Sequence, residues 1–156
     1  MSYAASVLQP GETILRMGRL HWTIYVRSLV YLALAGVVWA AVEAYFPEQR
    51  MFGLIAAALL LLLFCASFLH AWFVRWITEF AVTNRRVISK VGFINRRTVE
   101  MNMDKVQSVE VEQSITGRLF GYGTINVMGT GSDEGSVIRM KSIGNPIALR
   151  SAITSR

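Results

Sequence analysis

The sequence predicts an α+β membrane protein, in which a two-helix transmembrane hairpin carries a small antiparallel β-barrel or sandwich with a C-terminal helix. Two long apolar segments in the first half of the chain predict the hairpin, and short alternating segments in the second half predict the strands. The 156 residues have a mean hydropathy of +0.41, which is high for a soluble protein. The hydrophobic residues must therefore be concentrated in one part of the chain.

The composition divides the chain into three zones. Residues 1–21 are mixed and polar, and residues 22–74 are mainly apolar. Residues 75–156 carry twelve of the sixteen Lys and Arg residues. We expect an N-terminal segment with one extended piece, then the transmembrane hairpin, then a folded domain.

The middle zone contains two segments long enough to span a bilayer, at about 26–46 and 51–74. A hydrocarbon core of about 30 Å needs about 20 apolar residues in a helix. The second segment has no formal charge, and its "ALLLLLF" stretch is apolar on every side of a helix. Two buried helices of a soluble core are the alternative, but so small a domain has little interior to cover them.

The connector "PEQR" (47–50) predicts a tight antiparallel return, because Pro47 cannot continue a hydrogen-bonded helix. Both ends of the chain then lie on one side of the membrane. Basic residues flank the hairpin before and after it, whereas the connector holds Arg50 alone. The positive-inside bias therefore places both termini in the cytoplasm. We expect Glu43 at the far headgroup level, and an intramembrane ion site is the alternative.

The last zone changes to the two-residue periodicity of strands. Segments 77–83 and 86–93 are rich in β-branched and aromatic residues, and Asn84-Arg85 between them suits a hairpin turn. Further segments alternate between an apolar and a polar face, at 97–103, 106–113, 124–129 and 136–142. We interpret the series as short antiparallel strands, each with one solvated face.

Two helical segments are expected in the same zone. The first is a short helix in "SITGRLF" (114–120). The second covers 145–154, with Asn145 as its N-cap. Leu149 and Ile153 would share a face of this second helix and close one end of the sheet structure.

No cofactor site, metal site or catalytic site is expected. The glycine-rich "GYGTINVMGTGSDEG" (121–135) precedes a strand and lacks Gly-Lys-Ser/Thr, so we interpret it as a turn and a close-packed bend rather than a phosphate loop. His21 and His70 belong to no cluster with metal-ligand spacing, and no histidine lies in the last zone to activate a serine. Cys65 is the single cysteine, which excludes an intrachain disulfide. We therefore expect that the protein is not an enzyme.

The order of these segments resembles a known family. From "WITEFAVTNRRVISKVGFINRRTVEMNMDKVQSVEVEQSITGRLFGYGTINVMGTG" through "NPIALRSAI", about residues 75–153, the chain is similar to the bacterial pleckstrin-homology (PH-like) domain of YdbS-type membrane proteins. The opening "LQPGETIL" before a two-span hairpin fits the same family. The resemblance implies a PH-like barrel with a C-terminal helix, in a multi-pass protein of the bacterial cytoplasmic (inner) membrane. It also suggests a strand within residues 11–20, and leaves open whether that strand pairs with the C-terminal sheet.

A basic segment, "TNRRVISKVGFINRR" (83–97), holds five basic residues and no acid: Arg85, Arg86, Lys90, Arg96 and Arg97. A net charge of +6 and a pI near 10.0 also suggest an anionic partner. Anionic lipid is the functional interpretation, because each basic residue near an anionic leaflet contributes about 1 kcal/mol. A purely topological role, as positive charge beside a span exit, is the simpler alternative. Nucleic acid is disfavoured, because only Phe93 interleaves with the basic residues and no recognition module is present.

Together these features predict a non-enzymatic membrane protein that presents a cytoplasmic PH-like domain for interaction with proteins, anionic lipids or both. The expected partners are membrane lipids and, from the resemblance, another PH-like membrane protein or a second copy of this chain. The alternative is a small accessory subunit of a membrane transport or enzyme complex, in which the spans carry the function. An unrelated hairpin could replace the spans in the first case but not in the second.

Overall fold

The computed structural model describes residues 6–92, 97–131 and 137–155, and the chain divides into two compact units. The helical unit covers Trp22–Val74. The β unit combines the residues up to His21 with those from Arg75 onward. The folded β unit is therefore discontinuous in sequence, and the helical unit is inserted into it.

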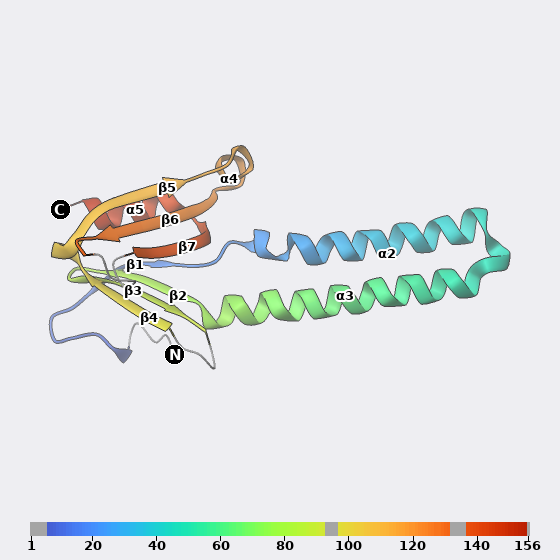
Figure 1. The fold of residues 1–156 in the computed structure, drawn as a ribbon, viewed down its shortest axis with the longest axis horizontal. Helices are drawn as coiled ribbons and strands as arrows, with labels where there is room; N and C mark the ends of the chain where they lie inside the picture. Colours follow the sequence, from blue (N-terminus) through green and yellow to red (C-terminus); the bar gives the residue numbers. More distant parts are fainter. Residues whose placement is uncertain (1–5, 93–96, 132–136, 156) are drawn as a thin grey trace. The chain divides into compact units, whose positions relative to one another are not determined.

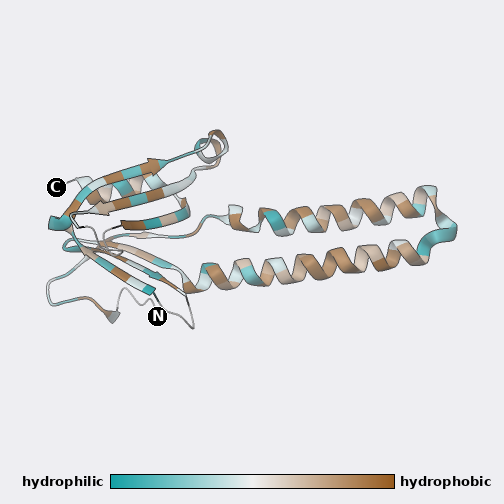
Figure 2. Cartoon of the chain, viewed as in Figure 1, coloured by the Kyte–Doolittle hydropathy of each residue, from teal (hydrophilic) through white to brown (hydrophobic). Residues whose placement is uncertain are grey.

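The helical unit is an antiparallel hairpin of α2 (Val26–Tyr45) and α3 (Arg50–Ile77) (Figure 1). The last three residues of α3 are counted with the β unit. A 3₁₀ turn, η1 (Trp22–Tyr25), precedes α2, and a second, η2 (Pro47–Gln49), joins the two helices. Both helices are long and apolar enough to cross a membrane by length and composition. Figure 2 shows hydrophobic residues along most of their length, with hydrophilic residues at the connector.

Polar contacts inside the helical unit lie towards its two ends. The hydroxyls of Ser28 and Ser67 lie 3.3 Å apart between the helices, and Ser28 is fully buried. At the connector, Arg50 Nε lies 3.5 Å from a carboxylate oxygen of Glu43. The ion pair joins Glu43 to the connector, and both side chains are at least half exposed.

In the described part of the β unit, seven strands form two antiparallel sheets. The first sheet has the order β1-β2-β3-β4, and the second has the order β5-β6-β7. The strands are β1 (Ile14–Gly18), β2 (Glu79–Thr83), β3 (Arg86–Val91), β4 (Arg97–Asn102), β5 (Val106–Glu112), β6 (Tyr122–Gly129) and β7 (Val137–Gly144). The predicted α+β class with antiparallel sheets is confirmed.

Strand β1 lies within residues 11–20, and this segment contacts both sheets. It pairs antiparallel with β2, with Met17 opposite Ala81 and Gly18 opposite Phe80. Two residues beyond β1, Leu20 forms an isolated antiparallel bridge with Ile143 of β7. The segment before the helical unit is therefore part of the same fold as the segment after it.

The two sheets and α5 (Pro146–Thr154) enclose one main hydrophobic core. It contains Phe80, Val82, Val87, Met101, Met103, Ile125, Val127, Ile138, Met140, Ile143, Leu149 and Ile153. Leu149 and Ile153, which were expected to share a face of the last helix, are both buried. Alternate residues of β7 point outward, so Arg139 and Lys141 are exposed. Hydrophobic and hydrophilic residues accordingly alternate along the strands in Figure 2.

Asn145 lies at the N-cap position of α5 but does not cap the helix with its side chain. Its backbone is left-handed, with φ 51° and ψ 56°, whereas a capping side chain acts from an extended backbone. The tight turn from β7 into α5 requires this conformation, and the Asn145 N–H donates to the carbonyl of Gly121 at 2.8 Å. Asn145 is therefore the N-cap residue, as predicted, but it lacks the side-chain hydrogen bond of a capping asparagine.

Candidate functional site

Both covalent connections to the helical unit leave the β unit from one end of its first sheet. β1 ends at Gly18, opposite Phe80 near the start of β2, and His21 is the last residue before the helical unit. β2 begins at Glu79, two residues after α3 ends at Ile77. We call this the connection end of the β unit. The opposite end, at the turn between β2 and β3, is the far end.

The second sheet contributes its own residues to the connection end. The His21 N–H donates to the carbonyl of Ser142 at 2.7 Å, and the Gly144 N–H donates to the carbonyl of Arg19 at 3.1 Å. The ring of His21 stacks on Tyr122, with 5.4 Å between the centroids. A short helix, α4 (Ile115–Phe120), directly precedes Tyr122 and therefore lies at the connection end as well.

The basic residues predicted to contact lipid do not form one cluster. Arg85 lies in the turn at the far end and is exposed. Lys90 lies opposite Glu79, and Arg97 lies opposite Val91, so both are at the connection end. A strand advances about 3.3 Å per residue, which separates Arg85 from Lys90 by about 17 Å. Arg96 lies outside the described residues.

Arg86, the remaining member of that set, is buried in an ion-pair network. Its Nε and Nη2 donate to the two carboxylate oxygens of Glu12 at 3.0 Å and 2.9 Å. Its Nη1 donates to Glu100 at 2.6 Å, and its Nη2 also donates to the carbonyl of Val7 at 2.8 Å. A guanidinium with these partners holds the N-terminal segment against the sheet. The structure therefore gives Arg86 a structural role and removes it from the set of lipid-contacting candidates.

The pKa values of this network follow from its contacts. Burial raises the pKa of Glu12, but hydrogen bonds from Arg86, the Gln9 N–H and Thr83 outweigh it and lower the pKa from 4.5 to about 2. The hydrogen bond to Glu12 raises the pKa of Arg86, and burial opposes that shift only in part. Both groups are charged at neutral pH, so the pair is ionic.

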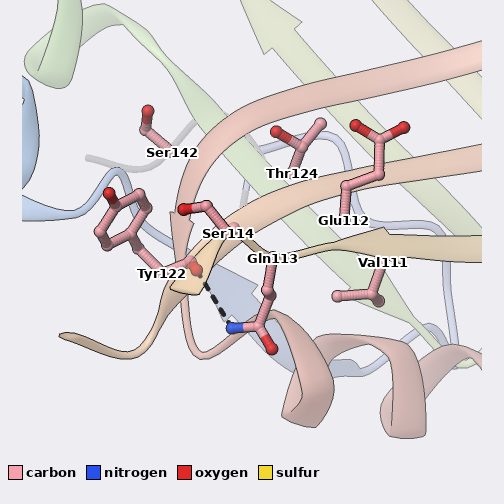
Figure 3. A pocket seen from close by; sticks show the side chains of 8 residues that line it. Val111, Glu112, Gln113, Ser114, Tyr122, Thr124 and Ser142 are labelled. Carbon is pink, nitrogen blue, oxygen red and sulfur yellow. Dashed lines mark hydrogen bonds between the residues drawn. The ribbon is translucent and has the colours of Figure 1, made fainter. Parts of the chain in front are cut away.

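A polar hollow of about 630 Å³ opens at the connection end, next to Ser114, the residue before α4 (Figure 3). Hydroxyl and carboxylate groups line much of it, from Glu112, Ser114, Tyr122, Thr124 and Ser142. At its edge the side-chain amide of Gln113 donates to the carbonyl of Tyr122 at 3.0 Å. Its lining contains no histidine, cysteine or basic residue, and the described residues include no group of three or more metal-ligating side chains. The hollow offers polar contacts from hydroxyl, amide and carboxylate groups.

The described glycines of the glycine-rich segment lie at the end of a helix, in a strand and in the turn after that strand. Gly121 ends α4 with a left-handed backbone of φ 74°, and Gly123 and Gly129 lie within β6. Among the described elements, β6 comes directly after Gly121 and β7 is the next one after Gly129, so a strand and not a helix N-terminus follows each of them. Residues 132–135 of the segment lie outside the described residues.

The fold and this site define a class of protein. The β unit consists of two small antiparallel sheets closed by a C-terminal helix, with a polar hollow at its surface. A sequence model described as Bacterial PH domain matches residues 14–156, from the first residue of β1 through the inserted helical unit to the end of the chain. No curated protein and no solved structure matches the chain. The chain belongs to the bacterial PH domain family, and this family points to an interaction module.

Sequence reasoning missed two features of the β unit. One is Glu12, whose partner Arg86 lies 74 positions later in the chain. The other is the outward direction of the apolar side chains of α4, where Ile115 is 89% and Leu119 is 78% exposed. The spacing of Ile115 and Leu119 indicates a shared helix face, but gives no sign that the face points away from the core.

Proposed function

We propose that this chain is a non-enzymatic integral protein of the bacterial cytoplasmic membrane. In this proposal the helical unit spans the membrane twice and anchors a cytoplasmic PH-like domain for interaction with proteins, anionic lipids or both. Membership of the bacterial PH domain family supports the interaction module. The length and composition of α2 and α3 support the anchor. The segment order from the opening "LQPGETIL" to the closing "NPIALRSAI" supports a place in the YdbS-type subfamily.

The observation that carries the proposal is the shared position of the two covalent connections. His21 is followed directly by the helical unit, and only Thr78 separates α3 from β2. Links this short keep the connection end within a few residues of the spans. The β unit would then face the bilayer with the end that holds Lys90 and Arg97, to which an anionic leaflet would contribute about 1 kcal/mol per basic residue.

The edge strands support a protein partner. β4 (Arg97–Asn102) pairs with β3 on one side, and no described strand pairs with its other side. An edge of this kind accepts a further strand through its backbone N–H and carbonyl groups. We propose another PH-like membrane protein or a second copy of this chain as the partner at such an edge.

Thiol labelling of the intact protein tests the anchor. Cys65 is the single cysteine and lies near the middle of α3 with its side chain exposed. In native membranes we expect a membrane-impermeant maleimide to label Cys65 only after the membrane is dissolved and the protein is unfolded. Rapid labelling of Cys65 in sealed membranes, or release of the protein by alkaline extraction, would contradict the anchor.

The same method tests the orientation in a Cys65→Ala background. Glu48→Cys in the connector should react in intact spheroplasts, and Thr130→Cys in the β unit should react only after permeabilisation. The reverse pattern would place the β unit outside the cytoplasm. Equal labelling of both positions before permeabilisation would contradict a two-span hairpin.

A further inference from the structure

Helix α4 has its apolar side chains on the outside. Ile115 is 89%, Leu119 78% and Phe120 50% exposed, although an amphipathic helix of a globular domain normally buries this face. The one buried residue of α4 is Gly117. A Cβ at Gly117 would lie 2.6 Å from the carbonyl oxygen of Tyr122, so the helix packs on its glycine and not on its large side chains.

Hydrogen bonds hold α4 in this inverted orientation. The hydroxyl of Ser114 accepts from the Gly117 N–H at 3.0 Å and caps the first turn. The hydroxyls of Thr116 and Tyr122 lie 3.0 Å apart. At the other end, Gly121 closes the helix with a left-handed backbone, φ 74°. The exposed face is therefore presented by a fixed structure and not by an unstructured loop.

Side-chain contacts link α4 to His21, the residue directly before the helical unit. Tyr122, which contacts Thr116 of α4, also stacks on His21 with 5.4 Å between the ring centroids. His21 is followed directly by Trp22, the first residue of the helical unit. Two side-chain contacts and one peptide bond thus connect α4 to the segment that enters the proposed span.

We propose that α4 inserts Ile115, Leu119 and Phe120 into the interfacial region of the bilayer, beside the point where the chain enters the first span. This inference rests on the proposed membrane anchor. Arg118 is exposed on the same short helix, and an arginine beside apolar residues can keep its charge at the lipid phosphates while the apolar side chains enter the acyl boundary. The helix would act as a second contact that fixes the orientation of the β unit against the membrane.

The neighbouring segment of the chain favours lipid as the occupant of this exposed face. The neighbouring segment η1 (Trp22–Tyr25) has the tryptophan and tyrosine that are enriched at membrane interfaces, with Trp22 46% exposed. The apolar face of α4 is linked to this segment through Tyr122 and His21. In the proposed anchor it would meet lipid, and no protein partner would be needed to cover it. A protein partner at α4 would instead have to fit between the β unit and the membrane surface.

Site-directed spin labelling of the full chain tests the insertion. In a Cys65→Ala background, single nitroxides are placed at Leu119→Cys, Ile115→Cys and the control Val137→Cys, in vesicles of phosphatidylcholine and phosphatidylglycerol. Val137 is also apolar and 49% exposed, but it begins β7 at the far end. We expect collision with oxygen to increase relative to collision with a water-soluble nickel complex at positions 115 and 119, and no such shift at position 137.

Two results would overturn the inference. Equal, water-like collision ratios at positions 115, 119 and 137 would show that α4 stays in solvent. Low collision with both oxygen and nickel at position 119 would show that protein covers the helix. The labelling of Cys65 is measured separately. If α4 is exposed to water while Cys65 is protected, only the insertion of α4 is contradicted. If Cys65 is accessible, the membrane anchor itself is contradicted.

Discussion

Arg86 and Glu12 form a bidentate ion pair, with 2.9 Å and 3.0 Å between the guanidinium nitrogens and the two carboxylate oxygens. The helical unit separates these two residues in the sequence. The pair therefore joins the two segments from which the β unit is built. A fragment that begins at residue 75 would lack both β1 and Glu12, so interaction experiments need the full chain.

Replacement of Arg86 should destabilise the β unit strongly. Arg86→Met leaves the carboxylate of Glu12, whose side chain is 1% exposed, without its main partner. Removing one partner of a buried ion pair costs about 3–5 kcal/mol. All four tryptophans lie between Trp22 and Trp76, so their fluorescence reports mainly on the helical unit. Proteolysis of the β unit in increasing urea is therefore the suitable measurement, in detergent-solubilised full-length protein.

Arg85→Met is the matched control for that experiment. Arg85 is adjacent in sequence and carries the same charge, but its side chain is exposed at the far end. A surface substitution of this kind should change the free energy of unfolding by no more than about 0.5 kcal/mol. Equal losses in the two variants would contradict the structural role of Arg86.

Acid should weaken the β unit through Glu12. The pKa of Glu12 is lowered from 4.5 to about 2 in the folded protein, so the unfolded state binds the proton more readily. The stabilisation is fully present above pH 4.5 and is lost as the pH falls from 4.5 towards about 2. We expect the urea midpoint of the β unit, followed by proteolysis with an acid-active protease, to fall over this range.

The Glu12→Gln variant isolates this contribution from that of the other carboxylates. It should be less stable than the wild type at neutral pH, and the difference between the two proteins should shrink as the pH falls. A constant difference between the two midpoints across the whole range would disprove the assignment to Glu12.

Close packing at Gly18 should make this position intolerant of a methyl group. An added Cβ would lie 2.9 Å from Phe80, 3.1 Å from Leu149 and 3.2 Å from Ile143, which come from both sheets and α5. Overpacking of this kind costs about 1–3 kcal/mol, so Gly18→Ala should lower the urea midpoint. Gly144→Ala is the control, because its nearest contact would be an ordinary 3.6 Å. If both variants unfold at the wild-type midpoint, the core does not close at Gly18 as described.

Local sequence patterns predicted the strands and helices, because the alternation of a strand and the length of an apolar helix can both be seen in consecutive residues. Ile138 and Met140 alternate with Arg139 and Lys141, and the structure buries the first pair and exposes the second. Pairing between distant segments produces no such pattern in consecutive residues. Nothing near Arg86 in the sequence indicates that its guanidinium faces Glu12 and not solvent or lipid.

The basic segment shows why residues that are adjacent in the sequence need not share a site in the fold. Five charges that are adjacent along the chain were treated as one cluster, but a hairpin distributes successive residues over its two ends and two faces. Arg85 is accordingly at the far end, Arg86 is buried, and Lys90 and Arg97 are at the connection end. The lipid contact of Lys90 and Arg97 remains a prediction.

The central claim, that the connection end of the β unit faces an anionic leaflet, is tested most directly by hydrogen exchange of the full chain in nanodiscs. Replacing phosphatidylcholine with phosphatidylglycerol should slow exchange at the β3 and β4 residues near Lys90 and Arg97. This slowing should be lost in the double variant Lys90→Gln/Arg97→Gln. It should be retained in Arg85→Gln/Lys105→Gln, which removes the same charge from exposed residues away from the connection end. Slowing that is equal in both double variants, or absent from the wild type, would contradict the account.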